Sequence, residues 1–365
     1  MGGRSPRDDG ILGVDRRKAL VTVGAALVLA AGTVVLIGRA ADFDELSDAA
    51  RAADEAWFPL CLGGLLCAYT GYVLAYRDVA RARGGPCFGP WTVVRVVAIG
   101  FGANLVASAA AGLAVDFWAL RRAGVGLHES ARRVLGLNTL KWAVLALFAA
   151  CAAAVVLLGR GDAPLAMILA WIAVFVLCLC AAAWVSAPSR ADRFTEVDTV
   201  ARPRRGRGPV AWARWAGAKL RNGLADAIGG VVVARYVVLH PHRYTAGVLG
   251  FPLYWFGHLL TLYAGLRAFS GGHVPLAALV LAFATGYAAT ALPLPGGGSG
   301  GIEAALTFSL HAVGVALAPA LLGVLLYRLF TFWLPVVPAL LLVPGARSLH
   351  DELPGTAREA AASAG

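Results

Sequence analysis

A stretch rich in proline and glycine, Leu292–Glu303, separates two apolar runs and ends in a carboxylate. An unpaired backbone group is costly in a bilayer, so irregular chain at membrane depth persists only where protein buries it or where it lines a wet cavity. The stretch therefore marks a place inside the membrane where the chain handles something polar.

The composition places the whole chain in a membrane. Hydrophobic residues make up 59% of the 365 residues, charged residues make up 15%, and the mean hydropathy is +0.71. A soluble domain of this size carries about 25% charged residues. The deficit, together with apolar runs of about 20 residues, predicts a polytopic membrane protein. In such a protein a net charge of +11 indicates cytoplasmic arginines and contact with anionic headgroups rather than with nucleic acid.

The first membrane half, residues 19–186, is predicted to contain four full spans. These are Ala19–Ile37, Trp57–Tyr76, Trp142–Leu158 and Ala163–Ser186. The loop after the first span is acidic, whereas the N-terminal tail, residues 1–18, ends in Arg16-Arg17-Lys18. By the positive-inside rule the N-terminus is cytoplasmic.

A broken apolar region near 91–120 lies between the second and third of these spans. A single crossing there would put Arg121, Arg122 and the arginines after them outside, against the charge bias. The break at Val106–Gly112 instead predicts a re-entrant helical hairpin that enters and leaves on the cytoplasmic side. We name this segment hairpin one.

Residues 187–243 are basic and connect the two membrane halves. We expect a cytoplasmic linker followed by an interfacial amphipathic helix, Val210–Leu239, that lies on anionic headgroups. The two histidines of His240-Pro-His242 have no carboxylate or cysteine at ligand spacing, so no metal site is predicted.

The second membrane half, residues 244–343, is predicted to begin and end with full spans. Tyr244–Phe269 crosses outward and Ala316–Val343 returns, followed by a cytoplasmic tail at 344–365. Between them, 274–314 forms a second re-entrant hairpin, hairpin two, which contains the glycine stretch. The predicted fold is therefore all-α, with about six full transmembrane helices and two re-entrant hairpins in an inverted repeat. Such repeats meet at the midplane in many transporters.

Two charged residues of the second half are candidates for substrate binding. Glu303 lies about three residues into the helix after Gly300, where it either caps the helix start, contacts substrate, or does both. Arg328 lies near the middle of the last span, where an unpartnered arginine costs at least about 2.5 to 3.5 kcal/mol. It either binds a lipid phosphate or forms a salt bridge to Glu303 or Asp116 that holds the hairpins together. We expect Glu303 and Arg328 to approach each other.

The remaining candidates lie at the two breaks. A glycine-rich helix start favours an anion such as a lipid phosphate, although the same residues can serve only as a hinge. In hairpin one, Asn104 and Asp116 are weaker candidates with structural alternatives. Asp116 follows Gly112 roughly as Glu303 follows Gly301. The candidates from the glycine stretch are Pro293, Pro295, Gly296, Gly297, Gly298, Gly300 and Gly301.

The C-terminal segments Pro293–Leu306, Gly314-Val315 and Leu326–Pro335 closely resemble the signature of the lysylphosphatidylglycerol synthase transmembrane-domain family. That family includes the flippase half of the bacterial multiple peptide resistance factor. The resemblance implies a bacterial inner-membrane protein that moves an anionic or aminoacylated phospholipid or another lipid-linked headgroup between leaflets. No soluble transferase domain follows Val343, so we expect no lysyl-lipid synthase activity and no enzyme. No cofactor is implied, and homo-oligomer formation stays open.

A second function remains open, a membrane glycosyltransferase that uses a polyprenyl-phosphate donor. Its metal-binding acids would be Asp42 and Asp44 in the first outer loop. Acidic loops are more often only solvated.

Overall fold

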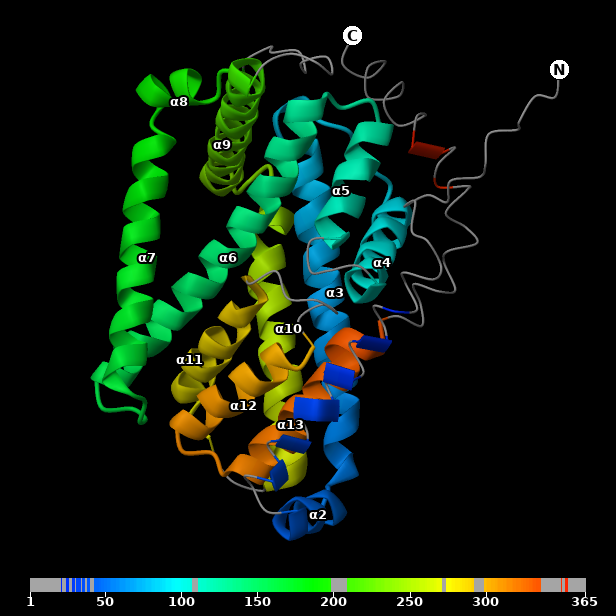
Figure 1. Ribbon diagram of the computed structural model, residues 1–365, viewed down its shortest axis with the longest axis vertical. Helices are drawn as coiled ribbons and strands as arrows, with labels where there is room; N and C mark the ends of the chain where they lie inside the picture. Colours follow the sequence, from blue (N-terminus) through cyan, green and yellow to red (C-terminus); the bar gives the residue numbers. More distant parts are fainter. Residues whose placement is uncertain are drawn as a thin grey trace, which may run out of the picture.

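Two long antiparallel helices, α3 (Phe58–Arg81) and α10 (Thr245–Ser270), form the centre of the computed structural model (Figure 1). The structure describes residues 43–106, 111–197, 209–270, 274–291 and 299–335, with single positions between 21 and 39 and at 349, 352 and 353. Over these residues every regular element is helical. The predicted fold class, an all-α polytopic membrane protein, is confirmed.

Glycines bring the backbones of α3 and α10 into direct contact. A Cβ at Gly71 would lie 2.4 Å from the Gly250 carbonyl oxygen, and a Cβ at Gly250 would lie 2.6 Å from the Gly71 carbonyl oxygen. Gly64 and Gly257 repeat this reciprocal contact at 2.7 and 2.4 Å. Close approach of small residues is the usual way for helices to associate tightly in a membrane.

Hairpin one consists of α4 (Pro90–Val106) and α5 (Ala111–Arg122), which pack against each other. The arm α5 has 12 residues and is therefore about 18 Å long, too short for a hydrocarbon core of about 30 Å. Most of the predicted break, 107–110, lies outside the described residues, so the re-entrant path of this segment stays a prediction.

Hairpin two consists of α11 (Leu276–Tyr287), the short 3₁₀ helix η3 (Ala288–Ala291) and α12 (Gly301–Ala312). Both α-helical arms have 12 residues. Figure 1 shows the helices of hairpin two in the half of the molecule opposite to those of hairpin one. Opposed placement of this kind is the arrangement expected for an inverted repeat.

Each hairpin leads into the next helix through the same turn. Val125 N–H donates to the Leu120 carbonyl at 3.1 Å after hairpin one, and Val315 N–H donates to the Leu310 carbonyl at 3.1 Å after hairpin two. The helices that follow are α6 (Leu127–Leu157) and α13 (Leu317–Arg328). The two halves therefore share local structure as well as element order.

Helices α7 (Leu165–Val185) and α9 (Pro209–Leu239) pack on α6, and the short α8 (Pro188–Phe194) joins them (Figure 1). In the described part of the chain, four helices are long and apolar enough to cross a membrane: Glu55–Gly84, Leu127–Leu157, Leu165–Val185 and Trp212–Leu239. The last of these lies within the predicted interfacial helix, whose placement at the headgroups stays a prediction.

The two ends of the chain differ from the expected spans. The first predicted span, Ala19–Ile37, lies largely outside the described residues. The last was expected as one helix to Val343, but α13 ends at Arg328 and continues as a π-helical turn, Leu329–Trp333. Leu334, the residue before Pro335, still has helical backbone angles (φ −60°, ψ −38°), and the rest of the predicted span, 336–343, lies outside the described residues.

Beyond this turn, two leucines of the C-terminal tail pack into the main core. Leu349 and Leu353 are fully buried there, and the Glu352 carboxylate accepts from the Arg95 guanidinium of α4 at 3.1 Å. The tail therefore contacts hairpin one. A short acidic helix, α2 (Phe43–Arg51), lies at the opposite end of the molecule (Figure 1).

Candidate functional site

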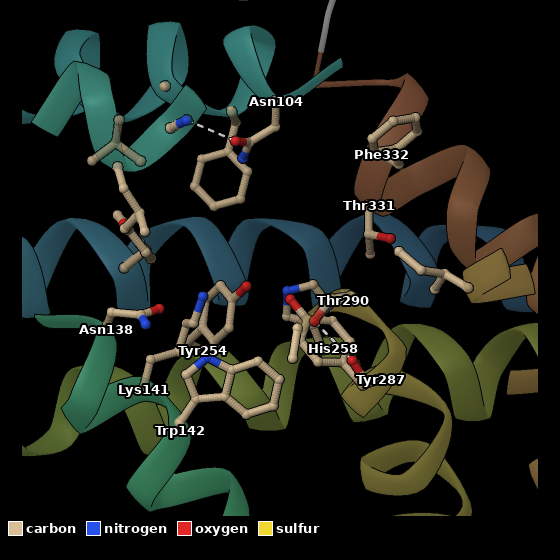
Figure 2. Close-up of a pocket in the computed structure, with 18 of the residues that line it drawn as sticks. Asn104, Asn138, Lys141, Trp142, Tyr254, His258, Tyr287, Thr290, Thr331 and Phe332 are labelled. Atoms are coloured by element: carbon tan, nitrogen blue, oxygen red, sulfur yellow. Dashed lines mark hydrogen bonds between the residues drawn. The ribbon is translucent and has the colours of Figure 1, made fainter. Parts of the chain in front are cut away.

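A cavity of about 420 Å³ lies between the tips of the two hairpins. Hairpin one closes one side, hairpin two and α13 close another, and α3, α6 and α10 form the wall between them. Figure 2 shows polar and aromatic side chains from these helices facing the cavity. Its charged and hydrogen-bonding residues are Tyr72, Asn104, Asp116, Asn138, Lys141, Trp142, Tyr254, His258, Tyr287, Thr290, Tyr327, Arg328 and Thr331.

Glu303 connects the start of α12 to the final helix. Its Oε2 accepts from the backbone N–H of Gly300 at 2.6 Å, and its Oε1 accepts from Nε of Arg328 at 2.8 Å. Gly300 has a φ of 86°, a left-handed conformation that glycine adopts without strain. With 1% of its surface exposed, Glu303 is a buried carboxylate that both caps a helix and pairs with a cation.

Arg328 is buried at 7% exposure, and only part of its guanidinium is used by the protein. Nε bonds Glu303, and the guanidinium carbon lies 4.0 Å from the centre of the Phe332 ring, one turn onward in the π-helical segment. Nη2 is buried and has no hydrogen-bond partner among the described residues. A buried donor without a partner costs about 1–3 kcal/mol, more when it is charged. Arg328 therefore lines the cavity and retains one buried donor without a partner in the described part of the chain.

His258, at the centre of α10, is the second cavity-lining residue with a buried nitrogen that has no hydrogen-bond partner among the described residues. Its Nδ1 lies 2.8 Å from the Tyr327 hydroxyl, and its Nε2 is buried without a partner in the described part of the chain (Figure 2). When the tyrosine hydroxyl donates to Nδ1, the hydrogen of a neutral imidazole is on Nε2, which is then a donor.

The hairpin-one side of the cavity has a different charge arrangement. Asp116 is 2% exposed, and its Oδ2 accepts from the Tyr72 hydroxyl at 2.8 Å. Tyr76 donates to the Asp116 backbone carbonyl at 3.2 Å. Lys141 of α6 interacts electrostatically with this carboxylate and lies between Asn138 and Trp142 in Figure 2.

Asn104 supports the tip of hairpin one. Its Oδ1 accepts from the backbone N–H of Gly112 at 2.7 Å, which joins the two arms of hairpin one (Figure 2). A Cβ at Gly112 would lie 2.9 Å from that oxygen. The side chain therefore has a structural role and also lines the cavity.

The structure brings several predicted residues together. Glu303 and Arg328 approach as expected, and Asn104, Asp116 and Arg328 line one cavity. Gly300 and Gly301 begin α12. Their roles in substrate binding stay predictions. The other candidates, Pro293, Pro295, Gly296, Gly297 and Gly298, lie outside the described residues.

Sequence reasoning missed the α6 side of the cavity. The predicted span begins at Trp142, directly after Lys141, whereas α6 begins at Leu127 and places Lys141 near its middle. A lysine in that position is a functional candidate by default. The aromatic residues of the site gave no such signal, because tyrosine and tryptophan are also common in membrane helices as packing residues. The aromatic residues that line the cavity are Tyr72, Phe101, Trp142, Tyr254, Tyr287, Tyr327 and Phe332.

Of the two acidic residues proposed for the alternative glycosyltransferase function, the structure describes only one. Asp44 lies in the first turn of α2, and Asp42 lies outside the described residues. Among the described residues, no group of three histidine, cysteine, aspartate or glutamate side chains is arranged to hold a metal ion.

Comparison with known proteins places these features in one family. No curated protein matches the chain. Residues 22–339 match the family described as the lysylphosphatidylglycerol synthase TM region. The match covers both hairpins, all cavity-lining residues and most of the chain. The chain is thus a multi-pass membrane protein that belongs to the lysylphosphatidylglycerol synthase TM region family.

Proposed function

We propose that this protein is a flippase-like transporter that binds the headgroup of an anionic or aminoacylated phospholipid, or of another lipid-linked compound, and moves it between leaflets. The observation that carries the proposal is the unpartnered Nη2 of Arg328, buried at a cavity between two opposed hairpins. The protein itself acts as a carrier without catalysing a reaction.

A lipid phosphate fits the unsatisfied guanidinium. Arginine binds phosphate oxygens in a planar fork, and such charge-assisted hydrogen bonds are about twice as strong as neutral ones. Glu303 occupies only Nε of Arg328, which leaves the outer nitrogens for a ligand. The carboxylate thereby orients the guanidinium while the ligand completes its hydrogen bonding.

The opposed hairpins supply the route. A headgroup in the cavity would reach one leaflet beside hairpin one and the other leaflet beside hairpin two, while its acyl chains stay in the bilayer. Membrane transporters built from inverted repeats bind substrate where such broken helices meet. Movement is passive or driven by a gradient, because no Lys-Ser/Thr follows the glycine stretch as in a nucleotide-binding loop.

The test is a liposome assay with the purified chain and fluorescent, acyl-labelled anionic lipids, in which transbilayer movement is followed by quenching of the outer leaflet. We expect Arg328→Lys to slow movement at least about tenfold, since lysine keeps a charge for Glu303 but lacks the second donor of the fork; tenfold corresponds to about 1.4 kcal/mol. Arg214→Lys, on the exposed face of α9, is the matched control and should leave the rate unchanged.

Two outcomes would contradict the proposal. The first is the absence of movement for every anionic lipid tested with the wild-type chain. The second is full activity of Arg328→Lys together with loss of function in the double variant Asp42→Asn, Asp44→Asn, which would favour the glycosyltransferase.

A further inference from the structure

We propose that lipid movement is coupled to protons, and that Asp116 of hairpin one is the group that carries one proton with each lipid phosphate. This inference rests on the proposed function and names its source of energy. It follows from the difference between the two carboxylate–cation pairs at the cavity.

The pair of hairpin two is closed. One oxygen of Glu303 accepts from Nε of Arg328 at 2.8 Å, and the other accepts from the backbone N–H of Gly300. Protonation of this carboxylate would leave the buried guanidinium without a counter-charge, which is strongly destabilising. Glu303 therefore keeps its charge and is unsuited to binding and releasing a proton.

The pair of hairpin one is open. Asp116 and Lys141 are the same number of residues apart as Glu303 and Arg328, and both line the cavity. They interact electrostatically, but in the described part of the chain no direct ion pair joins them, and Oδ2 of Asp116 accepts from the neutral Tyr72 hydroxyl. Burial favours a neutral acid, whereas a nearby cation and a donated hydrogen bond favour the carboxylate. These opposing influences make both protonation states of Asp116 accessible.

Lys141 is the cation that faces Asp116. Of the helices around this carboxylate, α3 contributes the Tyr72 and Tyr76 hydroxyls, α6 contributes Lys141, and α4 contributes the neutral amide of Asn104 to the cavity lining. The guanidinium of Arg95, also on α4, pairs with Glu352 of the tail. The titratable and charged groups across the cavity are Tyr254, His258, Tyr287, Tyr327 and Arg328.

A lipid phosphate and a proton favour each other's binding at this open pair. In the lipid-free cavity the Lys141 ammonium balances the charge of Asp116. A phosphate that binds this ammonium brings a second anion beside a buried carboxylate, and repulsion between like charges favours protonation of one of them. Asp116 takes the proton on a carboxylate oxygen, because a phosphodiester is the far stronger acid. The resulting carboxylic acid is a donor for a phosphate oxygen. By linkage, proton and phosphate each raise the affinity for the other.

One proton then accompanies one singly anionic lipid, so the transported unit is electrically neutral. Asp116 binds the proton where the lipid enters and releases it to water on the other side when the phosphate leaves Lys141. A pH gradient therefore drives lipid toward the alkaline side, whereas a membrane potential does not. The coupling acts on the phosphate, which anionic and aminoacylated phospholipids share.

The experiment imposes gradients on liposomes that contain the full chain and acyl-labelled phosphatidylglycerol, with protein-free liposomes measured in parallel. With the outside one pH unit more acidic, we expect enrichment of the inner leaflet that approaches tenfold, since one pH unit corresponds to a factor of about ten. A potassium-diffusion potential without a pH gradient should give no enrichment. Movement that ignores the pH gradient, or that follows the potential alone, would overturn this inference and leave the proposed function standing. No movement of any anionic lipid would overturn both.

Asp116→Asn identifies the proton-carrying group. The amide keeps an acceptor for Tyr72 and resembles the protonated acid, so lipid should still move while the enrichment by the pH gradient is lost. Asp48→Asn, on the exposed face of α2, is the matched control and should keep the full response. Full enrichment in Asp116→Asn would overturn the inference. Loss of all movement in a variant that thermal unfolding shows to be folded would do the same.

A dye that reports pH inside weakly buffered liposomes gives a second readout. When phosphatidylglycerol is added to the outer leaflet only, its inward movement should acidify the interior with the wild-type chain and not with Asp116→Asn. Lys141→Gln removes the ammonium that links the two ligands, so acidification per lipid moved should fall. Unchanged acidification in Lys141→Gln would contradict the coupling route through this ammonium.

Discussion

The two hairpins carry equivalent carboxylates that are held in different ways. Glu303 follows the tip of hairpin two and forms a buried ion pair with Arg328 of the next helix. Asp116 follows the tip of hairpin one, at the same sequence distance from Lys141 of its next helix, but accepts its hydrogen bond from the neutral Tyr72 hydroxyl of α3. One hairpin is thus fixed to its neighbour by charge and the other to the central helix pair by a neutral donor.

The two hairpin tips show the same difference, a neutral hydrogen-bond partner in hairpin one and a charged partner in hairpin two. A backbone N–H at each tip is satisfied by a side chain, which is the neutral amide of Asn104 for Gly112 and the charged carboxylate of Glu303 for Gly300. Breaking a buried ion pair costs about 3–5 kcal/mol, whereas a neutral hydrogen bond contributes about 0.5–1.5 kcal/mol. Hairpin two should therefore be the more firmly held of the two, and hairpin one the easier to displace during transport.

The largest effect is expected for Glu303→Gln. The amide cannot accept from both Gly300 and Arg328, and it leaves the guanidinium without a counter-charge, so the free energy of unfolding should fall by about 3–5 kcal/mol. Thermal unfolding of the purified protein in detergent measures this. The double variant Glu303→Gln, Arg328→Met removes the buried charge and should recover most of the stability but not the transport. A stable single variant would show that hairpin two does not depend on the ion pair.

Tyr72→Phe should have an intermediate effect. It leaves Oδ2 of Asp116 without its donor, and a hydrogen bond to a charged group contributes about 1.5–3 kcal/mol. Tyr69→Phe is the matched control one turn away on α3, because the Tyr69 hydroxyl is buried without a partner among the described residues. We expect its removal to be neutral or stabilising in the same unfolding measurement. Equal losses from both variants would contradict the assigned role of Tyr72.

The smallest effect is expected for Asp116→Asn. The amide oxygen can still accept from Tyr72, and Lys141 interacts with Asp116 at longer range than the Glu303–Arg328 ion pair, so stability should change by less than about 1 kcal/mol, far less than in the corresponding variant at Glu303. The two amide variants should be measured side by side under identical detergent conditions. If Asp116→Asn is as destabilising as Glu303→Gln, the two hairpins are held alike and the contrast between them fails.

Much of this architecture could be predicted from the sequence because the signals are strong. Apolar runs and arginine clusters placed both hairpins, and the mid-span position of Arg328 with the helix-start position of Glu303 predicted their contact. These features can be predicted because a charged side chain or an unpaired backbone group in a membrane costs free energy in any protein.

The rest of the site depends on which side of its helix each residue lies, and hydropathy alone does not report this. Lys141 resembles a span boundary because it precedes an apolar run. In the structure, α6 begins well before Lys141, and this residue lines the cavity. Likewise, the end of α13 at Arg328 and the π-helical turn after it were not predicted from the apolar pattern alone. That turn places Phe332 against the guanidinium.

The glycine contacts between α3 and α10 set a limit on how the molecule can move. Where two backbones touch at Gly64 with Gly257 and at Gly71 with Gly250, neither helix can slide or roll without a collision of main-chain atoms. We therefore expect the α3–α10 pair to move little as a unit, and any opening of the cavity to come mainly from movement of the hairpins relative to this pair.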